Sequence, residues 1–366
     1  MKNKTSALLL ITCMLAFSCA TNYEDEKTVL LSKNEQPDLA SSFDVEKEQA
    51  KIFENQQAPP EPKAVDKKSA KNSKNSKKKA AANEQAKAPV ASPSVSAPAT
   101  PEVVTAPTLP ADYPEEYKGY DAKSKLIWEK FKPVFYQGEQ SIMAVTYLGV
   151  TAGYITILSK EVVSLNNKQA FHFYARFKSS DSYRYFYWLD DKLDSFVEKE
   201  TFLPMKYSLI QREKKQNVDD LQLFDFKKMM TYNWYKRIKE GSNKDEKGEQ
   251  KIPSYAQDSF SALQFVRGLP LNKGDVYEFP VITRGKYWML KVEVVGEETI
   301  TVADKDVKAI KIKAETNFPG VLKKSGDIIF WYGADAEKRL LKFQAKIKIG
   351  SVYGELVEYK PGTKVL

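Results

Sequence analysis

A period-two alternation of apolar and polar residues dominates the chain after about residue 137, and no other feature constrains the fold as much. In residues 310–315 and 342–349, apolar side chains alternate with Lys, Glu or Gln. Such alternation is typical of antiparallel strands with one face in a core and one in water. Roughly a dozen such strands need a strongly curved sheet to limit their exposed edges. We therefore predict a mainly β fold with a large antiparallel, barrel-like or half-barrel sheet. Among its connections we expect a turn at Asn166–Asn167 and a polar, mobile loop at residues 241–250.

One short helix is predicted between the two β-rich halves, within residues 254–274. Asp258 or Ser259 can cap its first turn, because a side-chain oxygen can accept a free backbone N–H there. Gly268 followed by Pro270 provides the stop signal. The segment is mostly apolar, so we expect a buried helix that fills the concave side of the sheet.

Two residues of this helix, Phe260 and Leu263, are candidates for a second role. They share the apolar face of the helix. In the first interpretation, both are packed as part of a structural plug. In the second, they line a cavity that holds an apolar ligand, so they remain candidate ligand-contacting residues.

The N-terminus has the pattern of a bacterial lipoprotein signal peptide, over residues 1–18. Two early lysines precede an apolar run at residues 7–17 that is too short to cross a bilayer comfortably. Cys19 follows a sequence that resembles a lipobox, and we expect it to carry the lipid; Cys13 fits the pattern less well. The alternatives are an ordinary cleaved signal or an uncleaved anchor. Because Ala20 and not Asp follows, we expect the periplasmic face of the outer membrane.

Residues 19–111 are expected to form a long disordered tether. They are rich in Lys, Ala, Ser and Pro and lack any sustained apolar periodicity. The lysine run at residues 67–79 is interpreted as a solvated spacer, with binding to anionic lipid, lipopolysaccharide or the cell wall as the alternative. The net charge of +9 is weak evidence about partners, and nucleic acid is not expected. A short helical lead-in at residues 112–136 then precedes the β-rich domain at residues 137–360.

His172 is the single histidine of the chain. Its position in the alternating run at residues 171–178 places it on the polar face of a strand, so we expect it to be exposed and neutral. One histidine cannot form a multi-histidine metal site, and we also expect no histidine-based catalytic triad. We expect no metal and no cofactor.

Five of the six residues at 183–188 are aromatic, with Arg184 the exception, and the segment is predicted to be a strand with rings on both faces. Such a strand either packs between two layers or leaves rings exposed for binding. The core interpretation is favoured. Tyr183, Tyr185 and Tyr187 are the candidate partner surface under the alternative.

Three carboxylates follow the aromatic run: Asp190, Asp191 and Asp194. They could form an acid and base pair or a cation site. However, Asp-Asp-Lys after a strand is ordinary turn chemistry, so we expect a turn.

Several short motifs recur in an order that resembles a known bacterial family, over residues 137–359. They are Tyr147 with Gly149 and Gly153, the run DKLDSFVE at residues 191–198, Leu203-Pro204, Asp258, Ser261-Ala262-Leu263, Arg267 with Leu269-Pro270-Leu271, Gly274, Trp331, Arg339-Leu340 and Ile349-Gly350-Ser351. The chain is similar in these positions to the domain-of-unknown-function 3108 proteins. The resemblance implies an exported, β-rich protein, and it brings no catalytic residue to carry over.

Taken with the anchor and tether, these features favour a non-enzymatic binding or scaffolding module of the cell envelope. Its membrane contact is the N-terminal lipid, and its partner is an envelope protein, the cell wall or a lipid. A carrier of a lipid or acyl chain within the half-closed sheet is the alternative. A hydrolase that uses Asp191 and Asp194 is the least favoured.

The lipidation hypothesis makes a direct prediction. Cys19→Ser should block maturation or release a soluble form, because the acyl chains provide the stable membrane attachment. Cys13→Ser should change nothing. Membrane fractionation with acyl labelling of both variants tests this, and normal membrane partitioning of Cys19→Ser would refute the assignment.

Overall fold

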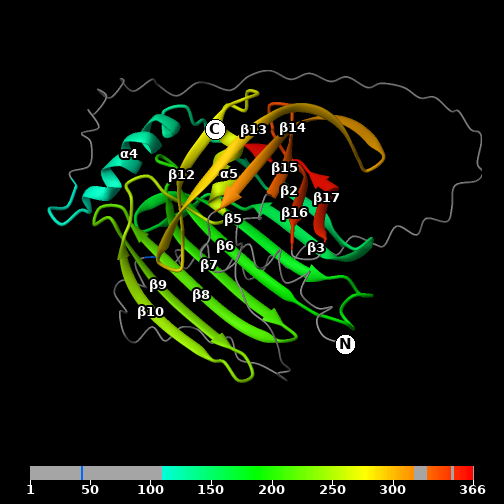
Figure 1. Cartoon of the computed structure of the whole chain (residues 1–366), viewed down its shortest axis with the longest axis horizontal. Coiled ribbons are helices and arrows are strands. Elements are labelled where there is room, and N and C mark those ends of the chain that lie inside the picture. The colour runs from blue at the N-terminus through cyan, green and yellow to red at the C-terminus, as the bar shows by residue number, and fades with distance from the viewer. Residues whose placement is uncertain (1–42, 44–108, 317–327, 348–349, 366) are drawn as a thin grey trace, which may run out of the picture. The chain divides into compact units, whose positions relative to one another are not determined.

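The structure is a computed structural model that describes residue 43 and residues 109–316, 328–347 and 350–365 (Figure 1). The predicted signal peptide, Cys19 and nearly all of the predicted tether lie outside these residues. The described chain is mainly β, with two helices. These are α4 (Glu115–Trp128), which forms the predicted lead-in, and α5 (Ser261–Gly268), the predicted interior helix.

The first half of the domain is a series of hairpins. Its strands are β1 (Tyr136–Gln137), β2 (Gln140–Tyr147), β3 (Val150–Ser159), β4 (Val163–Leu165), β5 (Lys168–Ser179), β6 (Asp190–Glu198), β7 (Pro204–Glu213), β8 (Gln216–Asp225), β9 (Met230–Ile238) and β10 (Lys244–Lys251). Asn166 and Asn167 both have positive φ, at 50° and 57°. They form the predicted turn between β4 and β5, since asparagine tolerates this conformation well.

The second half begins with β11 (Gln257–Asp258) and continues after α5. Its strands are β12 (Val276–Thr283), β13 (Lys286–Val302), β14 (Lys305–Thr316), β15 (Ile328–Gly333), β16 (Leu340–Lys346), β17 (Ser351–Lys360) and β18 (Thr363–Lys364). The alternation predicted at residues 310–315 and 342–346 is present. Ile312 and Ala345 are buried, whereas the lysines next to them in their own strands are less buried.

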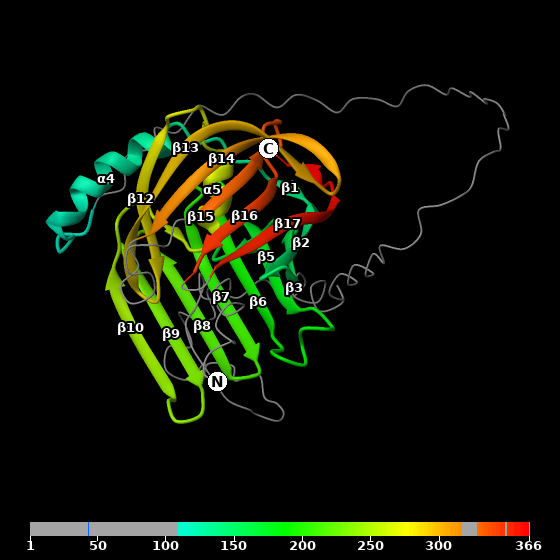
Figure 2. The ribbon, with the colours of Figure 1, turned by 45° about the vertical axis from the view of Figure 1, so that its right-hand side comes forward.

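One sheet joins both halves, in the order β10-β9-β8-β7-β6-β5-β3-β2-β17-β16-β15-β14-β13-β12-β11, with β4 beside β5. The neighbours are antiparallel apart from the short β11–β12 pair. Because β17 pairs with β2, the end of the domain closes on its beginning. Figures 1 and 2 show the two halves curving around α5. The sheet is strongly curved and not closed, as the half-barrel prediction required.

The interior helix α5 fills the concave side, as predicted. Asp258 holds its start, since one carboxylate oxygen accepts the backbone N–H of Phe260 at 2.7 Å and of Ser261 at 2.8 Å. At the other end, a Cβ on Gly268 would lie 2.2 Å from the Phe131 ring. Glycine is therefore needed there for close packing, and the helix stops two residues before Pro270.

The two edges of the sheet approach each other at the β12–β13 turn. Arg284 Nε lies 3.3 Å from the carboxylate of Asp220 on β8. A Cβ on Gly285, which has φ +69°, would lie 2.5 Å from the side chain of Asn233 on β9. The turn thus packs against β8 and β9 and nearly completes the barrel.

Two sequence predictions were wrong about local structure. Residues 183–186 form consecutive turns and residues 187–188 are irregular, so this segment is not a strand. Residues 241–250, predicted to be a mobile polar loop, provide most of β10, whose eight residues pair in register with β9. Strand β10 consists of Lys, Asp, Glu, Gln and Gly residues, and nearly all of them are exposed. This is expected for a charged edge strand that discourages further pairing.

Phe260 tests the packing of the interior helix. It is 2% exposed within the main core, so Phe260→Ala should cost on the order of 3–5 kcal/mol of unfolding free energy. Leu263→Ala is the matched control: Leu263 is only partly buried and should cost less. Urea midpoints of both variants measure this. Equal small losses would show that Phe260 is not packed as a plug.

Candidate functional site

The two most exposed aromatic residues of the described chain, Tyr185 and Phe186, lie on one loop, residues 180–188, which joins β5 to β6. We call it the aromatic loop. The exposed fractions are 82% for Tyr185, 71% for Phe186 and 40% for Trp188. Large apolar side chains exposed together on a surface commonly mark a contact site for another molecule. The loop is therefore the candidate functional site.

The base of the aromatic loop is fixed by buried hydrogen bonds. Tyr187 points inward, is 1% exposed, and donates its hydroxyl to the Glu213 carboxylate. Ser179 Oγ donates to the Tyr187 carbonyl at 2.9 Å and accepts the Leu189 N–H at 2.8 Å. Because Tyr187 is held inside, its neighbours are directed outward on a backbone that cannot easily rearrange.

Two further contacts hold the outer part of the loop. Lys214 Nζ donates to the carbonyls of Tyr185 at 3.3 Å and Phe186 at 3.2 Å. Ser180 Oγ donates to the Thr151 carbonyl at 2.8 Å. The first contact ties the loop to the β7–β8 turn and the second ties it to β3.

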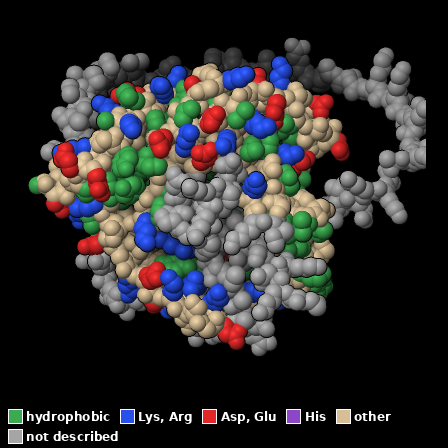
Figure 3. All heavy atoms as spheres, in the orientation of Figure 1, with side chains coloured by type: hydrophobic (Ala, Val, Ile, Leu, Met, Phe, Trp, Pro, Cys, Tyr) green, Lys and Arg blue, Asp and Glu red, His purple; other side chains and the backbone are tan. Residues whose placement is uncertain are grey.

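The contact with β3 brings a second exposed apolar group close to the aromatic loop. Leu148 at the β2–β3 turn is 69% exposed, and Val150 at the start of β3 is 53% exposed. In Figure 2 the β2–β3 and β5–β6 connections lie at the same end of the sheet. In the upper half of Figure 3, by contrast, Lys and Arg are interspersed with Asp and Glu over the second half of the domain.

A pair of buried carboxylates lies beneath the aromatic loop. Gln211 Nε2 donates to Asp191 at 3.3 Å and to Glu213 at 3.2 Å. Asp191 is fully buried, and burial together with the nearby Glu213 charge raises its pKa well above the usual carboxylate value. Two carboxylates sharing an interior site cannot both ionise easily, so the pair favours holding a proton.

The turn predicted for Asp190, Asp191 and Asp194 is wrong, because all three residues belong to strand β6. Asp191 is directly opposite Gln211, whereas Asp194 is opposite Ser208. Positions three apart on a strand point to opposite faces. Asp191 and Asp194 therefore cannot act together on one substrate as an acid and base pair.

His172 was predicted to be exposed, and the structure corrects this. It is 2% exposed on the outer face of β5, where its ring stacks on Phe196 with centroids 4.1 Å apart. Its Nε2 lies 2.6 Å from Asp194 Oδ1. Burial lowers the pKa of His172. Burial would raise the pKa of Asp194, but the His172 hydrogen bond and nearby Lys160 outweigh it and hold that pKa low.

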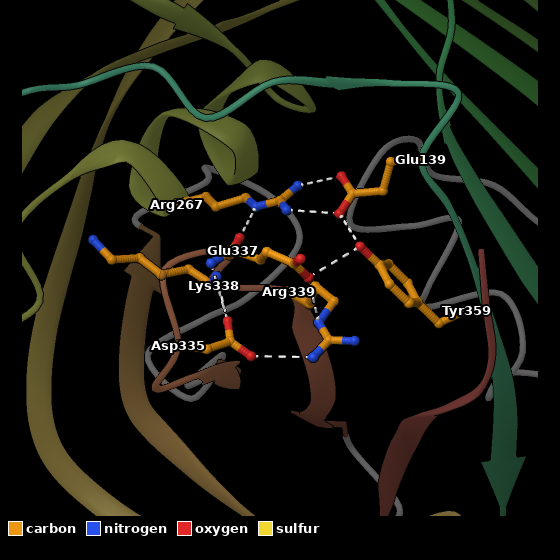
Figure 4. A network of polar contacts seen from close by, with 7 residues as sticks. All are labelled: Glu139, Arg267, Asp335, Glu337, Lys338, Arg339 and Tyr359. Atoms are coloured by element: carbon orange, nitrogen blue, oxygen red, sulfur yellow. Dashed lines mark hydrogen bonds and ion pairs between the residues drawn. The ribbon is translucent and has the colours of Figure 1, made fainter. Parts of the chain in front are cut away.

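A second polar group surrounds the end of α5 (Figure 4). Arg267 forms two hydrogen bonds to Glu139, at 2.6 and 2.7 Å, and both side chains are less than a tenth exposed. Tyr359 on β17 also donates to Glu139, at 3.0 Å. This network fastens the interior helix to the β1–β2 turn and to β17.

The β15–β16 turn completes this network. Its Glu337 carbonyl accepts from Arg267 Nε at 2.7 Å, and Lys338 Nζ donates to the Leu269 carbonyl at 2.6 Å. The cavity beside it has a volume of about 30 Å³, room for a water molecule or two and not for an acyl chain. Leu263 lines this cavity.

The five side chains predicted to contact a ligand or partner do not form one surface. Tyr185 is exposed on the aromatic loop, Tyr183 is half-buried at its start and Tyr187 is buried at its base. Phe260 is buried in the core and Leu263 lies beside the small cavity. Phe186 and Trp188 were missed, because the assumed strand gave alternate faces to a segment that forms turns.

The described residues contain no group of three or more His, Cys, Asp or Glu side chains arranged to hold a metal ion. Within the same part of the chain, no helix is long and apolar enough to cross a membrane.

No protein with a curated function matches the chain. Among solved structures, it is similar to a β-barrel-like protein of the DUF1849 family from Brucella abortus, with 9% identity, a TM-score of 0.44, and coverage of 62% of this chain and 99% of that one. It is also similar to a protein described as exported, with a YmcC-like fold, from Bacteroides fragilis, with 12% identity, a TM-score of 0.25, and coverage of 63% and 99%. These TM-scores are low, and the similarities carry no information about function.

The sequence profile of one family, described as a protein of unknown function, matches residues 143–357. This is more than half of the chain. Within that range lie the aromatic loop, the Asp191–Glu213 pair and Arg267, whereas Glu139 lies just before it. The chain therefore belongs to the DUF3108 family.

Proposed function

We propose that this protein is a non-enzymatic binding or scaffolding module of the cell envelope, and that the aromatic loop is its contact surface. In this proposal a lipid on Cys19 attaches it to the periplasmic face of the outer membrane, and the folded domain binds an envelope protein or polymer. The Cys19 attachment rests on the lipobox-like sequence, and the contact surface rests on the loop geometry.

One observation carries the proposal: Tyr185 and Phe186 are exposed on a loop whose base is fixed by Tyr187. Aromatic side chains contribute most of the binding free energy at many interfaces. A loop that is already ordered also loses less conformational freedom on binding. An ordered loop that exposes aromatic rings to water has no evident value for folding, so a binding role accounts for it better.

The interior supports the same conclusion. A carrier of acyl chains needs an apolar cavity of several hundred Å³, but the cavity beside α5 holds about 30 Å³, and its lining includes the charged side chains of Glu139 and Arg267 beside apolar ones such as Leu263. A hydrolase built on Asp191 and Asp194 is disfavoured by their opposite orientation on β6. Binding at the surface therefore has more support than either alternative.

The aromatic loop is tested by Tyr185→Ser with Phe186→Ser. We expect at least a tenfold loss of partner crosslinks from a photoreactive residue at position 188, with the urea midpoint nearly unchanged, because exposed substitutions usually alter stability by less than about 0.5 kcal/mol. Envelope crosslinking followed by mass spectrometry measures this.

Leu126→Ser is the matched control, because Leu126 is 59% exposed on α4 and far along the chain from the loop. It should retain the crosslinks. If both variants lose crosslinks equally, or if neither does, the aromatic loop is not the contact surface.

The buried carboxylate pair gives a prediction about pH. Because the folded-state pKa of Asp191 is raised, its contribution to stability is intact below the unfolded pKa of about 3.9 and declines as pH rises toward the folded pKa. Asp191→Asn removes this ionisation, so the variant should become more stable relative to wild type as pH rises above about 4. Asp304→Asn, at the exposed β13–β14 turn, is the control and should follow wild type. Urea midpoints across pH 3–8 would contradict the prediction if the Asp191→Asn and wild-type curves stay parallel.

A further inference from the structure

The first half of the sheet carries apolar side chains on its outer face as well as its inner face. His172, Phe196, Lys206, Leu223 and Tyr232 lie in one cross-strand row on β5 to β9. An apolar cluster surrounds this row. Its buried members on the sheet are Val163, Leu165, Ala170, Phe196, Met205 and Leu223, each at most 6% exposed. Side chains on an outer face are this well buried only if something covers them.

The structure shows one covering residue, and it comes from far away in the sequence. Phe43 is 4% exposed and belongs to the same cluster. Its backbone carbonyl accepts a hydrogen bond from Lys206 Nζ at 3.0 Å. The next described residue along the chain is Leu109, so Phe43 reaches the sheet across residues 44–108.

We propose that the outer face of β4 to β9 is the docking site for the chain's own N-terminal segment, with Phe43 as the anchoring side chain. The Phe43 ring fills the space among Phe196, Met205 and Leu223, and Lys206 binds its backbone. The contact is intramolecular, because the occupant seen on this face is part of the same chain.

Burial of the Phe43 ring and the tethering of its segment to the same chain both favour docking. Full burial of one phenylalanine side chain shifts an equilibrium by a factor of roughly 10 to 100. Because the segment is tethered to its own site, its effective concentration is on the order of millimolar and no second molecule is needed. The lysine contact adds directional selectivity, because an ammonium group binds a backbone carbonyl at one position on the face.

If Cys19 carries the lipid, as in the proposed function, docking of Phe43 limits the distance between the folded domain and the membrane. From Cys19 to Leu109 the chain has a maximal extended reach of about 300 Å, whereas from Cys19 to Phe43 it reaches only about 80 Å. Phe43 would thus hold the domain close to the membrane when docked and release it when displaced.

The docking contact is tested in the purified full chain with p-benzoylphenylalanine at position 43. This photoreactive residue should crosslink to peptides containing Met205 or Leu223. The same photoreactive residue at position 53, where Phe53 is the single aromatic residue of the sequence from 44 to 108, is the matched control and should give at least tenfold less of these products. Equal yields from positions 43 and 53, or crosslinks from 43 spread over the surface, would overturn the proposal.

A mixture of isotopically light and heavy chains separates docking within a chain from docking between chains. Crosslinked peptides of matching isotope composition support the proposal, and mixed pairs would overturn it in favour of a second copy.

The distance between the domain and the membrane is measured separately, by energy transfer from a dye on Leu126→Cys to a membrane dye. Phe43→Ala should reduce this energy transfer at least twofold. Unchanged energy transfer would refute the reach mechanism. If Cys19→Ser shows that no lipid is attached, the proposed anchor fails while the crosslinking result stands by itself.

Discussion

The packing of Phe265 is the contact on which the rest of this domain depends. Its ring centroid lies 4.1 Å from Trp128, 4.5 Å from Phe131, 5.1 Å from Phe279 and 6.2 Å from Phe202. These residues come from α4, the segment after it, β12 and the β6–β7 turn, so one side chain joins both halves of the sheet. An open, curved sheet cannot fill its own concave side, and α5 provides the missing core. The Arg267–Glu139 ion pair then fixes the helix, because removing either partner would leave a buried charge unpaired.

Much of this architecture could be predicted from local sequence. The alternating strands, the Asn166–Asn167 turn and the stop signal at Gly268 and Pro270 all depend on neighbouring residues, and all were confirmed. Residues 183–188 were not predictable in this way. Their aromatic composition favours a strand, but Ser179, Tyr187 and Glu213 form hydrogen bonds across the loop that outweigh this preference.

The polar interior could not be predicted, because its contacts are distant in the chain. Arg267 and Glu139 are 128 positions apart, and Tyr187 and Glu213 are 26 apart. His172 was assigned to water because it alternates with Phe171 and Phe173, and that facing was correct. What alternation cannot show is whether the polar face is itself covered. Here Phe196 and Asp194 cover it, and the histidine is buried. The outer face of this sheet carries a second apolar cluster, so the expectation that one face of an antiparallel sheet is exposed to water does not hold there.

The edges of the sheet limit the ways in which this domain can bind. An extended peptide can add to a sheet only where an edge strand offers free backbone groups. At one edge, β10 presents Lys244, Asp245, Glu246 and Lys247, and charged edges discourage such pairing. At the other, β11 has two residues, both buried, and α5 follows directly after. Neither edge of the described sheet is therefore suited to accept a strand. Under the proposed function, a partner would instead contact side chains on loops or faces, which is where the aromatic loop and the Phe43 site both lie.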